Sequence, residues 1–286
     1  NEMFLDSASL RSSIVSHSKT LGYVPTSARA AKATVDVTLN TNETTITMPA
    51  GTVFNTTVDG VSYKFSTITD ITKSNTGGGI PFLNTDIYEG TFISTRYAVN
   101  TSNIDQRFLL TDNRADTSTL TVTVQTSSTD TSSTTYTEAT DITQVTASSA
   151  VYFLQEVEAG LYEIYFGDGV IGKALDDGNI ISISYVVTNK TEANGATSFS
   201  LSGSISGFND ITLTVNSSAQ GGGEPETLQS IKTNASNFYS AQDRAVTTED
   251  YKTKVKQLYA NTQSVSAWGG EDAETPFYGR VYISIL

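Results

Sequence analysis

Few residues of this chain have the types and spacing that catalysis needs, and the first candidate is a lone histidine. His17 lies beside Ser13, Ser16 and Ser18 in a serine-rich segment. A histidine can activate a serine nucleophile when an acid orients its ring and a glycine turn provides an oxyanion site. No such glycine turn accompanies these residues, and serine is common throughout the chain. We therefore expect a surface or packing histidine.

Aspartates close to glycines suggest calcium binding as a second possibility. Asp168, Asp176 and Asp177 are arranged in this way. Their spacing does not match the EF-hand loop, which needs alternating oxygen ligands and a terminal glutamate. We interpret them as aspartates that stabilise turns, and we expect no metal ion.

A third possibility is hydrolysis of glycosidic bonds, which needs two acids facing each other across a cleft. Glu156 and Glu158 are two residues apart in a predicted strand and would share a face. No cluster of sugar-stacking aromatic residues accompanies them, so we interpret the pair as part of a solvated face. The sequence thus predicts no catalytic residue, no cofactor and no enzyme activity.

The composition restricts the classes of partner. The net charge of the 286 residues is −13 at pH 7, so a basic stripe for phosphate groups is absent and an anionic membrane would repel the chain. We expect neither nucleic acid nor membrane as a partner. Cysteine is absent, which excludes disulfides and thiolate metal sites. Because Asn1 and Leu286 both read as cuts, we expect a fragment that lacks its N-terminal part and extreme C-terminus.

Hydrophobic periodicity predicts the elements that position these residues. Residues 5–22 read as a helix, capped by Asp6 or Ser7, with Leu10 and Ile14 on its apolar face. Such a polar helix must dock on another part of the protein.

From Thr34 onward the apolar residues alternate with polar ones, as in a half-buried strand. Asp59-Gly60 predicts a hairpin turn, and strands are predicted at 87–99, with a bulge at Gly90, and at 104–110. The fold class is therefore α+β and β-rich. We predict four segments: an N-terminal helix and linker (1–33), a threonine-rich antiparallel β domain (34–150), a second β domain (151–220), and a helix-helix-strand-strand module (221–286).

The C-terminal module begins after the glycines at 221–223. Helical spacing predicts apolar faces at 228–239 and 251–259, the second preceded by a capping box of Thr247 and Asp250. The lone tryptophan of this module fits either an interface anchor or a core aromatic. The candidate interface residues are Leu228, Ile231, Phe238, Tyr251, Val255 and Trp268.

A glycine-rich stretch at 166–173 reads Phe-Gly-Asp-Gly-Val-Ile-Gly-Lys and predicts a tight turn between strands. Glycines provide positive φ angles, and an aspartate can bond its own backbone. The turn residues are Gly167, Asp168 and Gly169, with Gly178 and Asn179 in the next turn. Followed by Glu-Ala-Asn-Gly-Ala at 192–196, this pattern resembles the baseplate J-like proteins of contractile-tail phages. Stretches at 13–35 and 244–285 are similar to the baseplate wedge subunits of T-even-like phages within that family.

The resemblance implies a structural protein of the virion tail baseplate, assembled in the host cytoplasm and needing no cofactor. It implies a subunit that pairs with itself as a homodimer and contacts other wedge and hub proteins. Such subunits join wedges into a ring around the tail hub, and the ring rearranges when the tail contracts. The alternative from composition is a surface adhesin of β-sandwich type, whose tyrosine-rich strands would contact glycans.

Overall fold

The computed structural model forms two compact units. Unit 1 consists of Asn1–Thr26, Gln155–Gly160 and Pro225–Leu286, and unit 2 consists of Ser27–Leu154 and Leu161–Glu224. The four segments predicted from the sequence are a finer division and stay a prediction. The structure describes residues 2–103, 105–140, 142–242, 244–258, 262, 264–273 and 275–286.

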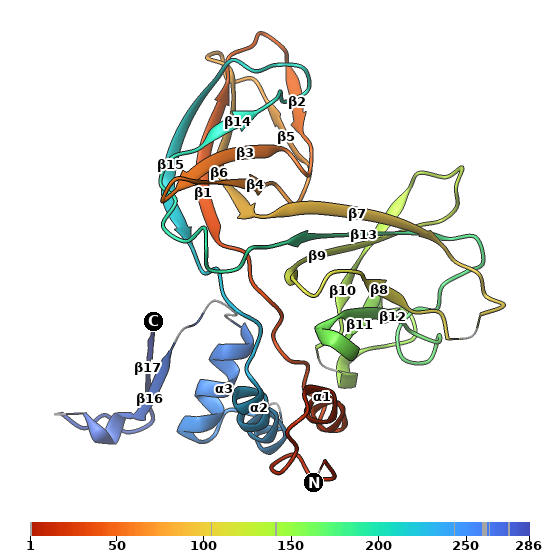
Figure 1. Ribbon diagram of the computed structural model, residues 1–286, viewed down its shortest axis with the longest axis vertical. Helices are drawn as coiled ribbons and strands as arrows, with labels where there is room; N and C mark the ends of the chain where they lie inside the picture. Colours follow the sequence, from red (N-terminus) through yellow and green to blue (C-terminus); the bar gives the residue numbers. More distant parts are fainter. Residues whose placement is uncertain are drawn as a thin grey trace. The chain divides into compact units, whose positions relative to one another are not determined.

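One large sheet of unit 2 has six strands, with antiparallel pairing throughout its described ladders. Their order is β14 (Ser200–Ser202), β3 (Val53–Val58), β4 (Val61–Ser66), β6 (Ile80–Glu89), β1 (Lys32–Leu39) and β15 (Ile211–Gln220) (Figure 1). A two-stranded sheet of β2 (Thr45–Met48) and β5 (Ile71–Ser74) accompanies it.

Alternation of apolar and polar residues builds the core of this sheet. In β1, Val35, Val37 and Leu39 are fully buried, while the residues between them are half-buried. They pack in one cluster with Phe54 and Phe82. The predicted period of two is confirmed. The predicted hairpin is confirmed as well, since Asp59 and Gly60 join β3 to β4 with φ angles of 49° and 82°.

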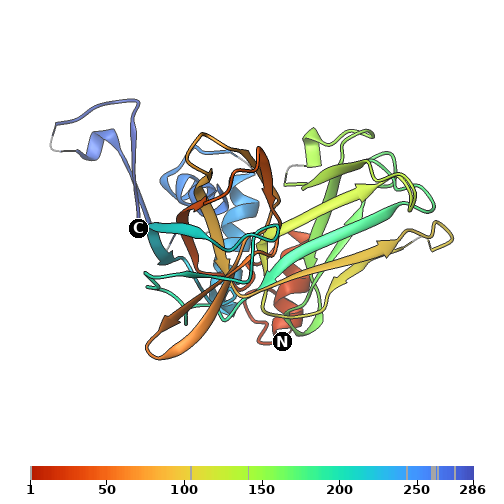
Figure 2. The same cartoon turned by 90° about the horizontal axis from the view of Figure 1, so that it is seen from above.

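The other large sheet of unit 2 has seven strands. Their order is β7 (Thr91–Ala98), β13 (Ile180–Val187), β9 (Ala115–Gln125), β10 (Ser133–Glu138), β11 (Val151–Glu156), β12 (Tyr162–Phe166) and β8 (Phe108–Leu110). Strands β10 and β11 are parallel, whereas β7, β13 and β9 form an antiparallel series. Figures 1 and 2 both show β7 alongside β13.

The strand predicted at 87–99 is two strands in different sheets, which corrects that prediction. β6 ends at Glu89, Gly90 has a φ of 124°, and β7 begins at Thr91. A Cβ on Gly90 would collide with the carbonyl oxygen of Val187, so the chain turns here where only glycine fits. Of the strand predicted at 104–110, β8 covers the last three residues, and Ile104 lies outside the described residues.

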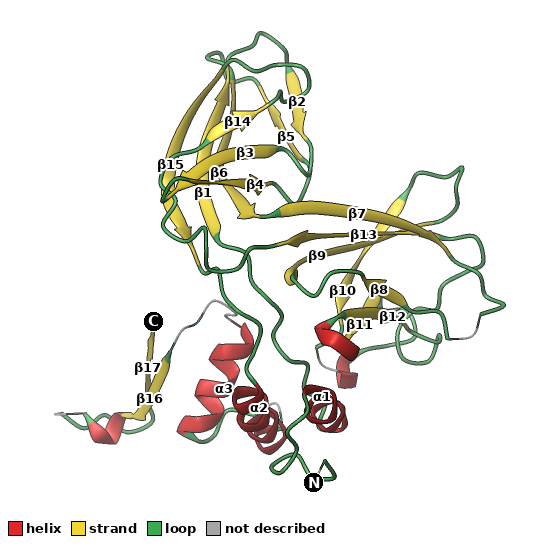
Figure 3. Cartoon of the chain, in the orientation of Figure 1, coloured by secondary structure: helices red, strands yellow, loops and turns green. Residues whose placement is uncertain are grey.

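The described α-helices, drawn in red in Figure 3, all belong to unit 1. Helix α2 (Leu228–Ala241) packs against α1 (Arg11–Thr20) and α3 (Thr248–Leu258), and α3 packs against the two-stranded sheet of β16 (Val265–Gly269) and β17 (Val281–Ile285). One of its core clusters joins Ile14 of α1 to Ile231 of α2, both fully buried. The helix-helix-strand-strand order is confirmed, and Tyr259 lies outside the described residues.

The predicted first helix starts later than expected, at Arg11 rather than near residue 5. Neither Asp6 nor Ser7 caps it. The Glu2 carboxylate accepts hydrogen bonds from the backbone N–H groups of Ser9 at 3.0 Å and Leu10 at 3.2 Å. Leu10 is 58% exposed rather than packed. Because a distant glutamate satisfies these N–H groups, local capping signals did not locate the helix start.

Candidate functional site

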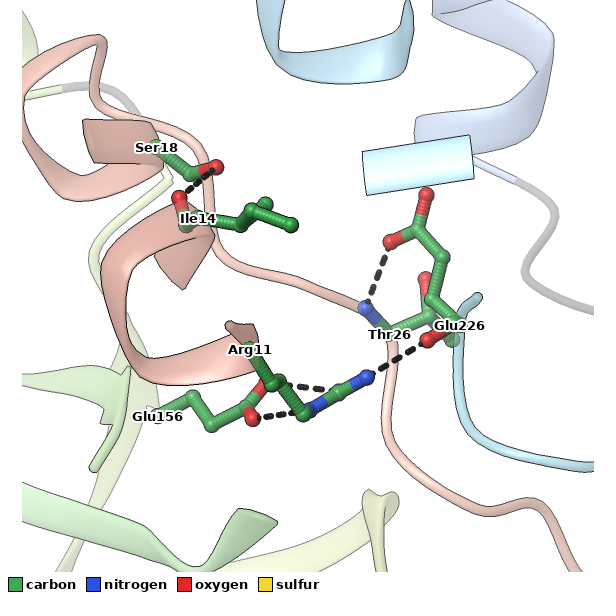
Figure 4. Close-up of polar contacts among 6 residues, drawn as sticks. All are labelled: Arg11, Ile14, Ser18, Thr26, Glu156 and Glu226. Atoms are coloured by element: carbon green, nitrogen blue, oxygen red, sulfur yellow. Dashed lines mark hydrogen bonds and ion pairs between the residues drawn. The ribbon is translucent and has the colours of Figure 1, made fainter. Parts of the chain in front are cut away.

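His17 and its neighbouring serines have structural roles. The Nε2 atom of His17 lies 2.8 Å from the carbonyl oxygen of Glu2. The Ser18 hydroxyl is buried and donates to the carbonyl oxygen of Ile14 at 2.8 Å (Figure 4). The side chains of His17 and Ser18 are thus engaged with backbone carbonyl groups, as expected for a packing histidine.

The Glu2 contacts predict a pH dependence of unit 1. Hydrogen bonds from Ser9, mainly its hydroxyl, lower the pKa of Glu2 from 4.5 to about 2. A lowered folded-state pKa gives stability that is present above pH 4.5 and is lost as the pH falls towards 2.

We expect Glu2→Gln to lower the thermal midpoint of unit 1 at pH 6, with a difference from wild type that shrinks below pH 4.5. Fluorescence of Trp268, the chain's one tryptophan, measures this. A difference that is constant from pH 6 to pH 2 would contradict the assignment.

Glu156 and Glu158 do not form a solvated acidic pair, which corrects that interpretation. Glu156 is the last residue of β11 and its side chain is 1% exposed. Glu158 is exposed in a short 3-10 turn with Ala159 at a φ of 59°. The strand ends between the two acids, so the two side chains do not share a strand face and do not form the acid pair that a glycosidase needs.

The Glu156 carboxylate binds the guanidinium of Arg11 through two bonds. Arg11 Nε lies 2.6 Å from Oε1, and Nη2 lies 2.9 Å from Oε2 (Figure 4). The third nitrogen of the guanidinium, Nη1, donates to the carbonyl oxygen of Glu226 at 2.7 Å. Arg11 therefore joins α1, the end of β11 and the segment before α2, all within unit 1.

The Glu226 side chain is a second junction in unit 1. Its Oε2 accepts from the Tyr23 hydroxyl at 2.8 Å and from the N–H of Thr26 at 3.1 Å, and its Oε1 accepts from Ser230 and Asn234. Burial raises the pKa of Tyr23, and the charge of Glu226 adds to this effect. No sequence signal predicted this network, because Arg11 and Glu226 are 215 positions apart.

The Gly-Asp-Gly turn has the aspartate bonds predicted from its residue types, and Gly169 has the predicted positive φ (87°), whereas Gly167 does not. Asp168 Oδ1 accepts from the N–H groups of Val170 at 2.9 Å and Ile171 at 3.0 Å, and these bonds lower the pKa of Asp168. A Cβ on Gly167 would lie under 3.0 Å from backbone atoms of Ile171 and Gly172. The turn therefore excludes side chains at position 167, and it exposes Val170 (73%) and Ile171 (42%).

The next turn is held by an asparagine. Asn179 is buried, its Oδ1 accepts from the N–H of Asp176 at 2.9 Å, and its Nδ2 donates to the carbonyl oxygen of Thr126 at 2.9 Å. Gly178 has a φ of 78° and Asp177 accepts from the N–H of Thr101. In the part of the chain that the structure describes, no group of three or more acids, histidines or cysteines could hold a metal ion. The carboxylates of Asp168 and Asp177 accept backbone N–H groups in these turns.

The six candidate interface residues differ in exposure. Ile231 (0%) and Val255 (8%) are buried within the chain, whereas Trp268 is 38% exposed and stacks on Tyr282. The other three, Leu228, Phe238 and Tyr251, are half-buried. Tyr23 meets the ring of Phe238 edge to face at 5.9 Å. An interface role for these six residues stays a prediction.

The predicted capping box at the start of α3 is confirmed. Asp250 accepts from the N–H of Thr247 at 2.8 Å, and the N–H of Asp250 donates to the Thr247 hydroxyl at 3.2 Å. A cavity of about 410 Å³ lies beside this cap, between α2 and α3, with Arg244 and Glu249 among its lining residues. The cap uses the Asp250 carboxylate, so this acid serves the helix rather than a ligand.

Apolar side chains are exposed along β16, β17 and their connection. The two strands, Val-Ser-Ala-Trp-Gly and Val-Tyr-Ile-Ser-Ile, contain no charged residue. Val281 (38%), Ile283 (41%) and Ile285 (50%) lie on one face of this sheet, and we call them the C-terminal apolar surface. Trp268 (38%) pairs with Tyr282 on the other face, and Phe277 (46%) and Tyr278 (85%) are exposed in the connection. An isolated two-stranded sheet is marginally stable in water, so this surface needs cover beyond α3.

Two family models match these same regions. The model of the phage baseplate wedge protein gp6, third domain, matches residues 93–197, and the model of the baseplate structural protein gp6, C-terminal domain I, matches residues 247–286. Baseplate wedge protein gp6 of Enterobacteria phage T4 is 25% identical over 308 residues, an alignment that covers 98% of this chain. These similarities identify a baseplate wedge subunit.

The similarity to gp6 falls on the same residues as the motifs. The turns around Asp168 and Asn179 fall in the third-domain match, which begins at residue 93 and so includes strands that carried no recognised motif. Helix α3 and the C-terminal apolar surface fall in the other match. The chain spans 45% of the length of the T4 relative. Similarity to baseplate wedge proteins places the protein in the virion tail baseplate. No described helix is long and apolar enough to cross a membrane.

Proposed function

We propose that this chain is the part of a gp6-type wedge subunit that pairs with a second copy of itself and helps to join wedges into a ring around the tail hub. The ring rearranges on tail contraction, and other wedge and hub proteins are its further partners. The observation that carries the proposal is the C-terminal apolar surface, which lies in a region that matches a baseplate structural protein.

Self-pairing is supported by charge. A two-fold interface brings each patch against its own copy, so any charge on the patch meets a like charge. The whole chain carries −13, yet β16 and β17 carry no charged residue. Their aromatic and aliphatic side chains are the types enriched in the cores of subunit interfaces. The same net charge supports the proposal that neither nucleic acid nor a membrane is a partner.

Sedimentation velocity over a concentration series tests the pairing. We expect a dimer, and we expect Ile283→Asp to weaken the dimer at least tenfold, because two buried aspartates would face each other without cations. Circular dichroism should stay unchanged. Leu83→Asp is the matched control, since Leu83 is 57% exposed on β6 in unit 2. A strict monomer at high concentration, or equal weakening by both variants, would contradict self-pairing through this surface.

A further inference from the structure

Residues 155–160 have an unusual place in unit 1. Their neighbours on both sides, Leu154 and Leu161, belong to unit 2. The other two parts of unit 1 are long segments that contain its helices, whereas this one is the end of a hairpin formed by β11 and β12. Residues 155–160 therefore hold their place in unit 1 through non-covalent contacts alone.

The ion pair of Arg11 with Glu156 is a central contact of this hairpin end. Both carboxylate oxygens are bonded, at 2.6 and 2.9 Å, and the Arg11 side chain is 30% exposed against 1% for Glu156. A buried ion pair fixes geometry strongly but contributes little net stability, because both charges are rehydrated when it opens. A contact of this kind suits a segment that must bind in one defined position and must also be able to dissociate from the rest of unit 1.

The receiving side of the contact is held in place independently. Arg11 Nη1 donates to the Glu226 carbonyl oxygen at 2.7 Å, and the Glu226 side chain is fixed by Tyr23, Thr26 and the first turns of α2. If residues 155–160 leave, these bonds remain and keep the guanidinium oriented. The binding site for residues 155–160 on unit 1 is thus held by its own bonds and does not depend on these residues being bound.

We infer that residues 155–160 form a releasable latch, which docks on unit 1 through Arg11 and detaches without unfolding of α1 or α2. The latch lets the hairpin end change partners while the helices stay folded. Its use during baseplate rearrangement rests on the proposed function, but the docking itself does not.

Hydrogen exchange of the full chain, read by mass spectrometry, tests the latch. We expect Arg11→Gln and Glu156→Gln each to accelerate exchange at least tenfold in peptides covering 155–160, with changes below twofold in α1 and α2. The double variant should be no faster at 155–160 than Arg11→Gln alone, because Arg11→Gln already removes the ion pair with Glu156 as well as the bond to the Glu226 carbonyl oxygen. Arg107→Gln is the matched control, since it opens the Arg107–Glu163 pair in unit 2.

Unchanged exchange at 155–160, or equal acceleration throughout unit 1, would overturn the inference, since the segment would then be static or inseparable from the helices. Glu156→Gln keeps the size of the side chain and carries the test should Arg11→Gln fail to fold. The same variants keep the C-terminal apolar surface, so sedimentation of each reports on the proposed function separately. A dimer with a static segment would overturn the latch alone.

Discussion

Gly167→Ala is expected to lower the free energy of unfolding of unit 2 by about 3 kcal/mol, the upper end for overpacking. The added Cβ would lie under 3.0 Å from backbone atoms of Ile171 and Gly172. Side chains can rotate away from such a collision, but backbone atoms cannot. Relief would require the turn to open, which would break the bonds from Val170 and Ile171 to the Asp168 carboxylate. Denaturant unfolding followed by far-ultraviolet circular dichroism, dominated by the strands of unit 2, measures the loss.

Gly178→Ala provides the matched control in the next turn. Gly178 has a φ of 78°, but nothing lies within 4 Å of its would-be Cβ. Alanine there meets only the cost of a left-handed conformation, about 1 kcal/mol. Equal losses of unfolding free energy for Gly167→Ala and Gly178→Ala would mean that the close backbone approach at position 167 does not explain why this position needs glycine.

Local patterns predicted the strands because their information lies within a few residues. The alternation of Val35, Val37 and Leu39 specifies which face is buried, and Asp59-Gly60 specifies the hairpin turn. The turns at Asp168 and Asn179 were predicted for the same reason, since the Asp168 carboxylate and the Asn179 side-chain oxygen accept from N–H groups two or three positions away. The bond from Asn179 to the Thr126 carbonyl oxygen, 53 positions away, was not predicted. The exception is Gly90, where a bulge within one strand and a change of sheet have the same sequence signal.

The polar network of unit 1 could not be predicted, because its partners are far apart in the chain. Arg11 and Glu156 are 145 positions apart, and neither residue belongs to a recognisable motif. Glu156 and Glu158 were interpreted as a solvated pair because no cluster of sugar-stacking aromatic residues accompanies them and glutamates are mostly exposed. The burial of Glu156 depends on a basic partner that only the tertiary fold provides. The start of α1 was misplaced for a related reason, since Glu2 bonds the N–H groups of Ser9 and Leu10 just before the helix, from seven and eight positions away.

The apolar faces of the C-terminal helices show a further limit of periodicity. A stripe of residues at helical spacing predicts burial, but it does not say whether the covering surface comes from the same chain or from another subunit. Ile231 was predicted as an interface residue, and the structure places it at 0% exposure against Ile14 and Ala8. Its burial needs no second subunit, which has a measurable consequence.

Ile231→Ala is expected to lower the free energy of unfolding of unit 1 by about 4 kcal/mol, through lost transfer free energy and the cavity left behind. Because the contacts of Ile231 lie within the chain, the loss should be the same at every protein concentration. Loss at a subunit interface would instead vary with concentration by mass action. Trp268 fluorescence in a denaturant series, repeated over a hundredfold range of concentration, separates these cases. Leu258→Ala, at a 75% exposed position on α3, should cost less than about 0.5 kcal/mol. If the loss of unfolding free energy for Ile231→Ala depended on protein concentration, Ile231 would contribute to a subunit interface.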